Sequence, residues 1–328
     1  MRIRHASFAG ATTLVAGIAA IATAAGSAPD DARPQGRDEL LVEAFDRVDR
    51  STELTHVDTI DLDFETFHPQ AMEVTDDRIY LSSVEIIEAP EHYEEPDGGY
   101  DRSPGRGVGH VFVLDREGNL LEDIEISDGD RYHPGGIDVH GDTLYVPVAE
   151  YRPHSSSDIY RIDLDTYEVT RLFGVDDHIG GVVLDQQTRR LVGQSWGSRQ
   201  FYEWSTKGKQ KDSWRNENHF LDYQDCEYVA SRKTLCSGVT GLPAQPGVDG
   251  GYELGGFAMI DLRDGHRILH EVPLQLWSTA GHVITRNTTD LDAEPTADGT
   301  RLTLYAAPDD SEEEAGTQVL VYTADITG

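Results

Sequence analysis

The chain has 328 residues, and its 60 acidic residues against 27 basic ones give a formal net charge of −33 at pH 7. Nucleic acid and anionic membrane surfaces repel so acidic a chain, and we therefore expect neither as a partner. The length would hold two average domains, but all-β propellers commonly use it as one unit, and we expect a single folded domain.

Residues 1–28 have the features of a secretory signal peptide. A short basic head, Met1 to His5, leads into a weakly apolar stretch rich in Ala, Gly and Thr, and small residues follow it. A membrane anchor is less favoured, because the stretch is only weakly hydrophobic and an acidic segment continues from it. We predict a secreted or otherwise extracytoplasmic protein without membrane contact after signal removal. Residues 29–50 are expected to form an acidic lead-in with room for a short helix, and residues 51–328 the folded domain.

A motif recurs along the rest of the chain, in which a histidine leads small residues into an apolar run. It begins at Phe67, Tyr132 and Asp177. Recurrence at spacings of tens of residues is typical of stacked or radially arranged units. Short strands separated by turn residues surround each copy, and four antiparallel strands joined by hairpins make one propeller blade.

We predict an all-β fold, a five-bladed β-propeller. The expected strands are 68–74, 79–86, 109–114 and 120–126 in the first blade; 136–139, 143–148, 158–164 and 168–173 in the second; 181–184, 190–195, 200–205 and 210–214 in the third; and 226–229, 234–239, 256–262 and 267–272 in the fourth. The fifth has 281–285, 301–306 and 317–322, and an N-terminal strand at 55–62 is expected to complete it and close the ring. A sixth blade that includes part of 38–50 is the alternative, and a β-sandwich is the rival fold.

Cys226 and Cys236 fall on strands expected to be antiparallel neighbours in the fourth blade. Because an exported protein meets an oxidising compartment, we predict a disulfide between them. Two unpaired core thiols are the alternative.

The repeat also predicts a site. Inner strands of a propeller run in the same sense around the channel, so His68, His133 and His178 should be neighbours at one mouth. Alignment of the fourth blade places Asp222 in the same position, and His282 of the fifth blade lies slightly deeper. Three imidazoles and a carboxylate suit a divalent transition metal such as zinc, iron or copper. Metal-free ligand binding and a purely architectural role remain alternatives.

The ends of the second strands should surround the same mouth. Glu85 and Glu150 occupy matching positions there and could act as acid or base, with Arg199 beside them. Surface acids in salt bridges are the alternative interpretation. We assign substrate contacts to aromatic and charged side chains of these segments: Tyr132, Tyr151, Trp196, Tyr223, Arg286 and Asp309. The long connection 88–108 is too long for a plain hairpin, and we expect it to form a lid.

Several segments, Thr66 to Gln70, Tyr132 to Asp138, Asp176 to Val182, Asp222 to Cys226 and Tyr305 to Asp310, resemble a family of exported bacterial proteins of unknown function. The resemblance covers about 40–322 and implies a propeller-like fold outside the cytoplasm, with no reaction attached. A looser analogy is to propeller oxygenases that hold iron with four histidines, from which Asp222 and the blade count depart.

We therefore predict a secreted, metal-dependent propeller enzyme that acts on a small molecule by hydrolysis, elimination or isomerisation. A monomer is expected. A non-enzymatic propeller that binds a small molecule, glycan or protein at the same mouth is the alternative, and a purely structural propeller is the third interpretation.

Overall fold

The computed structural model describes residues 36–244, 251–263, 266–311 and 316–327. All of them belong to one compact unit, Asp31–Gly328. The predicted signal peptide and residues 29–35 of the acidic lead-in lie outside the described residues. No helix in the described ranges is long and apolar enough to cross a membrane.

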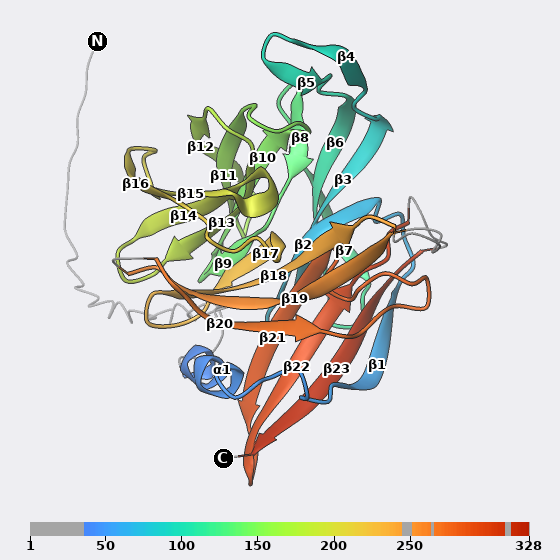
Figure 1. The fold of residues 1–328 in the computed structure, drawn as a ribbon, viewed down its shortest axis with the longest axis vertical. Helices are drawn as coiled ribbons and strands as arrows, with labels where there is room; N and C mark the ends of the chain where they lie inside the picture. Colours follow the sequence, from blue (N-terminus) through green and yellow to red (C-terminus); the bar gives the residue numbers. More distant parts are fainter. Residues whose placement is uncertain (1–35, 245–250, 264–265, 312–315, 328) are drawn as a thin grey trace, which may run out of the picture. The chain divides into compact units, whose positions relative to one another are not determined.

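Five antiparallel sheets form the blades of a five-bladed β-propeller, as the repeat predicts (Figure 1). Blade 1 contains β2 (His68–Val74), β3 (Ile79–Glu88), β6 (Arg106–Leu114) and β7 (Leu120–Glu125); blade 2 contains β8 (Arg131–Pro134), β9 (Asp138–His140), β10 (Thr143–Glu150), β11 (Ser157–Asp163) and β12 (Val169–Val175). Blade 3 contains β13 (Ile179–Asp185), β14 (Arg190–Ser195), β15 (Gln200–Ser205) and β16 (Gln210–Arg215); blade 4 contains β17 (Asp222–Tyr228), β18 (Lys233–Leu242), β19 (Tyr252–Asp261) and β20 (Ile268–Leu274). Blade 5 contains β21 (Thr288–Pro295), β22 (Gly299–Ala307) and β23 (Thr317–Thr327), and β1 (Thr55–Leu62) completes it.

The N-terminal strand closes the ring. β1 pairs antiparallel with β23 over most of its length, so the two ends of the chain share one blade (Figure 1). The pairing covers the edge of β23, which would otherwise offer unpaired backbone groups to other chains.

One strand prediction of the fifth blade is wrong. The inner strand is β21 at Thr288–Pro295, whereas residues 281–285 form an irregular connection in which Ile284 N–H donates to the Leu276 carbonyl. Val283 and Ile284 are fully buried, so their apolar character imitated a strand although their backbone leaves the ladder. The segment 38–50 contains a helix, α1 (Arg37–Phe45), and no sixth blade.

The core consists of apolar clusters between neighbouring blades. Consecutive side chains of an inner strand point to opposite faces, and Val182 packs toward blade 2 while Val183 packs toward blade 4. The junction of blades 4 and 5 is also covered by α1, which buries Leu41, Ala44 and Phe45 there. Because both faces of each blade are buried, the ring is held together mainly by the hydrophobic effect.

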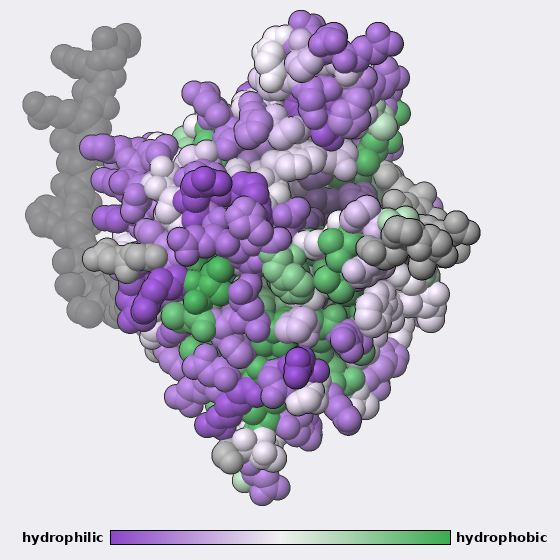
Figure 2. All heavy atoms as spheres, viewed as in Figure 1, coloured by the Kyte–Doolittle hydropathy of each residue, from purple (hydrophilic) through white to green (hydrophobic). Residues whose placement is uncertain are grey.

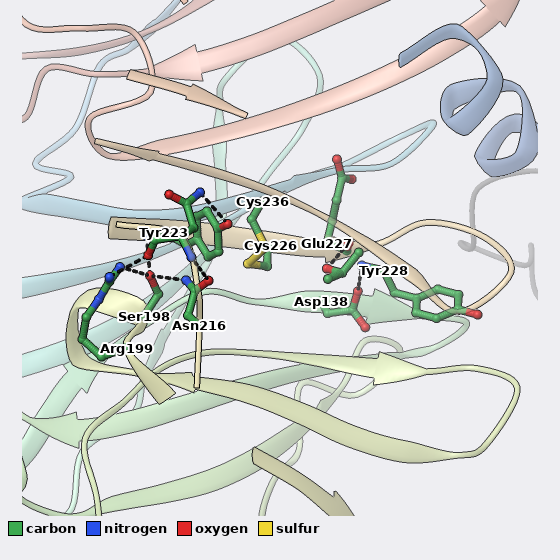
Figure 3. Close-up of a disulfide and its surroundings, with 11 residues drawn as sticks. Asp138, Ser198, Arg199, Asn216, Tyr223, Cys226, Glu227, Tyr228 and Cys236 are labelled. Atoms are coloured by element: carbon green, nitrogen blue, oxygen red, sulfur yellow. Dashed lines mark hydrogen bonds between the residues drawn. A yellow bond between two sulfur atoms is a disulfide. The ribbon is translucent and has the colours of Figure 1, made fainter. Parts of the chain in front are cut away.

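Buried carboxylates join the inner strands to one another. Asp138 of β9 accepts hydrogen bonds from the backbone N–H groups of Leu184 and Tyr228, which belong to blades 3 and 4 (Figure 3). Asp225 of β17 accepts one from Met72 N–H of β2, and Asp290 of β21 accepts one from Val74 N–H of the same strand. These bonds cross-link the centre of the ring and fix where the inner strands begin.

Candidate functional site

The three histidines of the repeat lie at one end of the ring, which we call the mouth. Each is placed by pairing with the end of its second strand: His68 opposite Val84, His133 opposite Ala149, and the carbonyl of His178 accepting from Trp196 N–H. The rings of His133 and His178 have centroids 5.7 Å apart, and His68 is close enough to act electrostatically on His133.

His68 is paired with a buried carboxylate. Its Nδ1 lies 2.7 Å from Oδ2 of Asp310, whose side chain is fully buried, while the His68 side chain retains 20% exposure. A carboxylate at Nδ1 favours the tautomer that carries its proton there, and it leaves Nε2 as an acceptor. Sequence reasoning named the neighbouring Asp309 and missed this pair, although both aspartates lie just after the end of β22.

His133 and His178 form an aromatic cluster with Tyr151 and Trp196. His133 stacks on Tyr151 with centroids 4.2 Å apart, and His178 meets Trp196 edge-on at 4.7 Å. Tyr151 and Trp196 are themselves 5.8 Å apart and partly exposed. The two aromatic residues therefore form a wall over nearly buried imidazoles.

Both buried imidazoles are neutral near pH 7. Burial lowers the pKa of His178 to about 4, although the Glu150 carbonyl and the Asp177 carboxylate act in the opposite direction. Burial also lowers the pKa of His133 well below its usual value, and His178 and His68 add to the effect. Nδ1 of His133 has no hydrogen-bond partner among the described residues, which is unusual for so buried a polar atom.

Glu150 is held by an arginine that sequence reasoning missed. Its carboxylate receives Arg152 Nε at 2.7 Å and Ser156 Oγ at 2.7 Å, and its backbone carbonyl accepts from Nδ1 of His178 at 2.7 Å. Glu150 thus fixes the tautomer of His178 through its main chain, while its carboxylate is occupied by Arg152. Glu85, its counterpart in blade 1, is half-buried, and its carboxylate makes no hydrogen bond or ion pair within the described ranges.

The inserted connection of blade 1 forms a hairpin beside this cluster. Strands β4 (His92–Asp97) and β5 (Tyr100–Arg102) extend beyond β3 and β6 (Figure 1). Arg102 lies over the ring of Trp196 at 5.4 Å, and Arg152 lies over Tyr100 at 3.6 Å. The hairpin therefore adds a cationic and aromatic wall to the mouth.

Two predicted substrate contacts are part of the scaffold. The phenol of Tyr132 is buried and donates to the Pro104 carbonyl at 2.7 Å, which anchors the connection after β5. Tyr223 is buried beside the disulfide, where its hydroxyl accepts from Asn218 at 2.9 Å (Figure 3). Burial raises the pKa of Tyr223 to about 12. Both hydroxyls are therefore engaged by the protein.

Arg199 is likewise occupied by the protein. Its guanidinium donates to the carbonyls of Gly197, Asn218 and Leu221, and Nη2 lies 3.0 Å from Oδ1 of Asp222. Burial raises the pKa of Asp222, and Arg199 acts against this rise. The pair holds the loop after β14 against β17, so Asp222 lies in an ion pair at the edge of the mouth.

A second cluster of polar side chains lies at the mouth on the side of blade 5. His282 Nδ1 lies 3.0 Å from Oδ1 of Asp309, which also accepts from Ser278 Oγ at 2.7 Å. Arg286 contacts the ring of His282 and lies 3.6 Å from Glu253. Asp309 and Asp310 are consecutive, so this group and the His68 pair are adjacent.

The predicted metal ligands do not form a metal-binding set in this arrangement. Among the residues that the structure describes, no three His, Cys, Asp or Glu side chains are arranged to hold a metal ion. Nδ1 is hydrogen-bonded in His68, His178 and His282, so these imidazoles could ligate only through Nε2, and Asp222 pairs with Arg199. We therefore derive no chemical step through a metal.

The predicted disulfide is present. Cys226 and Cys236 are directly opposite each other on β17 and β18 and are joined at 2.04 Å. Figure 3 shows the bond between two polar groups, with Ser198, Arg199 and Asn216 on one side and Asp138 on the other.

Residues 37–327 match the model of a family of unknown function, DUF6454. The chain belongs to this family. The match spans the propeller strands from β1 to β23. None of the curated proteins matches the chain in sequence.

Solved structures similar to this family member include several propellers at low identity. The β-propeller domain of the trilobed protease from Pyrococcus furiosus is 12% identical, with 80% of this chain and 70% of that chain covered and a TM-score of 0.33. A luciferin-regenerating enzyme is 11% identical over 84% and 99% of the two chains, with a TM-score of 0.44. The tail fibre of Staphylococcus aureus phage P68 is 12% identical over 88% and 56%, with a TM-score of 0.45. Similarities this weak carry no argument about function.

Proposed function

We propose that this protein is an exported enzyme that binds a small polar molecule at the mouth and transfers a proton through His68. The observation that carries the proposal is the 2.7 Å contact between His68 Nδ1 and the fully buried carboxylate of Asp310. A buried carboxylate that orients an imidazole stabilises the imidazolium formed when Nε2 accepts a proton. The partial exposure of His68 leaves room for that proton to come from a substrate or from water.

The neighbouring imidazoles fit the same proposal. His133 and His178 are neutral near pH 7, so they can bind a polar group by hydrogen bonding without adding charge. Tyr151 and Trp196 offer apolar faces against which a substrate ring or chain can pack. Elimination, isomerisation and hydrolysis by an activated water each need one such base, and the proposal extends to these three classes.

Export is proposed on two grounds. The Cys226–Cys236 disulfide requires an oxidising compartment to persist, and residues 1–28 have the sequence features of a signal peptide.

A non-enzymatic binding propeller is the second candidate, and a specific observation favours it. Two side chains expected to be catalytic, Glu150 and Arg199, are saturated by internal hydrogen bonds. This leaves His68 as the main proton-transfer group of the mouth, with Glu85 half-buried beside its strand.

The first experiment is to incubate the mature protein in D2O with a panel of lactones, β-hydroxy acids and sugar acids, and to follow deuterium uptake and product formation by NMR. We compare the wild type with His68→Gln and with His92→Gln, a control on the exposed β4–β5 hairpin. Loss of about 100-fold or more in rate in His68→Gln alone would support proton transfer by His68. Binding that is equal in all three proteins, without exchange or turnover, would favour the second candidate.

Metal content is measured in parallel on protein purified without chelator, beside the His68/His133/His178 triple alanine variant. Near-stoichiometric zinc, iron or copper that disappears in a folded variant would replace the proton-transfer proposal with a metal-based one.

A further inference from the structure

A cavity of about 380 Å³ lies away from the mouth, between α1 and blades 4 and 5. Its walls combine the end of α1, the loop after it and strands of both blades. The apolar side chains that line it include Phe45, Val48, Leu54, Phe257, Leu276 and Leu304. The volume falls in the range of small-molecule pockets, about 300–1,000 Å³, and protein cores normally leave few voids larger than one water.

The surface near this cavity is unusual for so acidic a chain. Figure 2 shows hydrophobic residues reaching the surface over the region where Figure 1 draws the strands of blades 4 and 5, among an otherwise mostly hydrophilic shell. On the strand side the lining is mostly apolar and offers water few polar partners, whereas the loop after α1 adds polar side chains. An apolar ligand would gain the contacts that the walls lack.

The cavity is held open by fixed contacts around its rim. His270 Nε2 donates to the Val48 carbonyl at 2.7 Å, and the ring of His270 meets Phe45 edge-on at 5.4 Å. Asp49 forms a tight turn by accepting from Ser51 N–H at 2.7 Å and donating its own N–H to Thr52. The loop after α1 therefore cannot easily collapse onto the sheet to fill the space.

Arg50 also lines the cavity and is the one basic residue among the described residues that do so. It forms no hydrogen bond or ion pair with another described residue. Arg50 and Glu53 are both exposed, and the charge of Arg50 acts on Asp49, whose carboxylate also accepts from Ser51 N–H. A guanidinium whose hydrogen-bond donors are not used by the protein suits a carboxylate, which it can bind through two parallel hydrogen bonds.

We propose that this cavity binds a medium-chain aliphatic carboxylate, with its chain among the leucines and phenylalanines and its head at Arg50. The site is separate from the mouth, so the proposal stands independently of the proton-transfer function.

The test measures binding of decanoate, decanol and decylamine to the mature protein by calorimetry, with three variants. Arg50→Gln should weaken decanoate about tenfold or more and leave decanol unchanged, because only the carboxylate uses the guanidinium. Arg47→Gln, on the same surface but outside the lining, should leave both unchanged. Leu276→Trp should abolish binding of all three ligands, because the larger side chain fills the cavity. Leu54→Trp replaces it as the filling variant if Leu276→Trp does not fold.

Several outcomes would overturn the proposal. These are no decanoate binding to the wild type, binding that survives both filling variants in folded protein, and equal loss in Arg50→Gln and Arg47→Gln. Tighter binding of decylamine than of decanoate would assign the head-group contact to Glu53 and would rule out a carboxylate as the ligand's head group.

Discussion

The imidazole of His133 lies against the ring of Tyr151 with centroids 4.2 Å apart, while its buried Nδ1 has no partner among the described residues. A stacked ring with an unsatisfied polar atom serves stability poorly, because a buried polar group without a hydrogen bond costs about 1–3 kcal/mol. The same atom would gain a partner from a ligand that enters the mouth and displaces the aromatic cover of the imidazole.

We therefore expect His133→Phe to keep the stack and to leave the free energy of unfolding unchanged or slightly higher. Affinity for any ligand of the mouth should fall about tenfold, the effect of one lost hydrogen bond. Urea unfolding and calorimetry measure the two quantities, with His154→Phe, a highly exposed position, as control. A loss of stability of more than about 2 kcal/mol in His133→Phe would show that the imidazole is architectural.

Acid should destabilise the fold through His178. Burial lowers its pKa to about 4 in the folded state, against about 6.5 in the unfolded chain. The unfolded state therefore binds the proton first, and the free energy of unfolding falls as the pH drops from about 6.5 to about 4. For this one residue the loss is about 3 kcal/mol, and it levels off below that range.

The variant His178→Asn isolates this effect, because its amide can still donate to the Glu150 carbonyl. Urea unfolding between pH 4 and pH 8 should give a shallower decline for the variant than for the wild type. Carboxylates with shifted pKa values, such as Asp225, titrate in both proteins and cancel in the difference. Parallel curves would mean that His178 is not neutral in the fold.

The repeat made the fold predictable, because a histidine followed by small residues marks the start of the first three inner strands. The fifth blade lacks this motif, and there the apolar pair Val283 and Ile284 misled the assignment of β21. Which side chains pair with each other was harder to predict from the sequence than the order of the strands. Glu150 and Arg152 are close in sequence, but their spacing does not show whether the two side chains pair with each other at the mouth or extend separately into solvent.

His68 and Asp310 illustrate the same limit across 242 positions of sequence. They meet only because β1 closes the ring and brings blade 5 beside blade 1. Sequence reasoning predicted that closure, but the choice between Asp309 and Asp310 depends on the alternation of side chains at a strand end, where the ladder stops and the period-two rule no longer holds.

The disulfide should contribute directly to stability. Cys226 and Cys236 are buried and close a short loop, and a cross-link of this kind stabilises a fold by about 2–4 kcal/mol, largely through the unfolded state. We expect the double alanine variant to lose about that amount in urea unfolding. Reductant should lower the stability of the wild type and leave the variant unchanged. Equal sensitivity of both proteins to reductant would contradict the assignment.

Asp138 should be more important for stability than any single residue of the mouth, because it joins three blades. Its two oxygens accept from Leu184 N–H and Tyr228 N–H, both in the interior of the ring. In Asp138→Asn one oxygen becomes an NH2 group that faces an N–H donor, so one buried bond is lost and a repulsive contact replaces it. We expect a loss of about 2–4 kcal/mol in the free energy of unfolding. Asp142→Asn, an exposed position in the following turn, provides the matched control and should change stability by less than about 0.5 kcal/mol. If the two variants unfold at the same urea concentration, the carboxylate of Asp138 does not hold the inner strands together, and the apolar junctions alone close the ring.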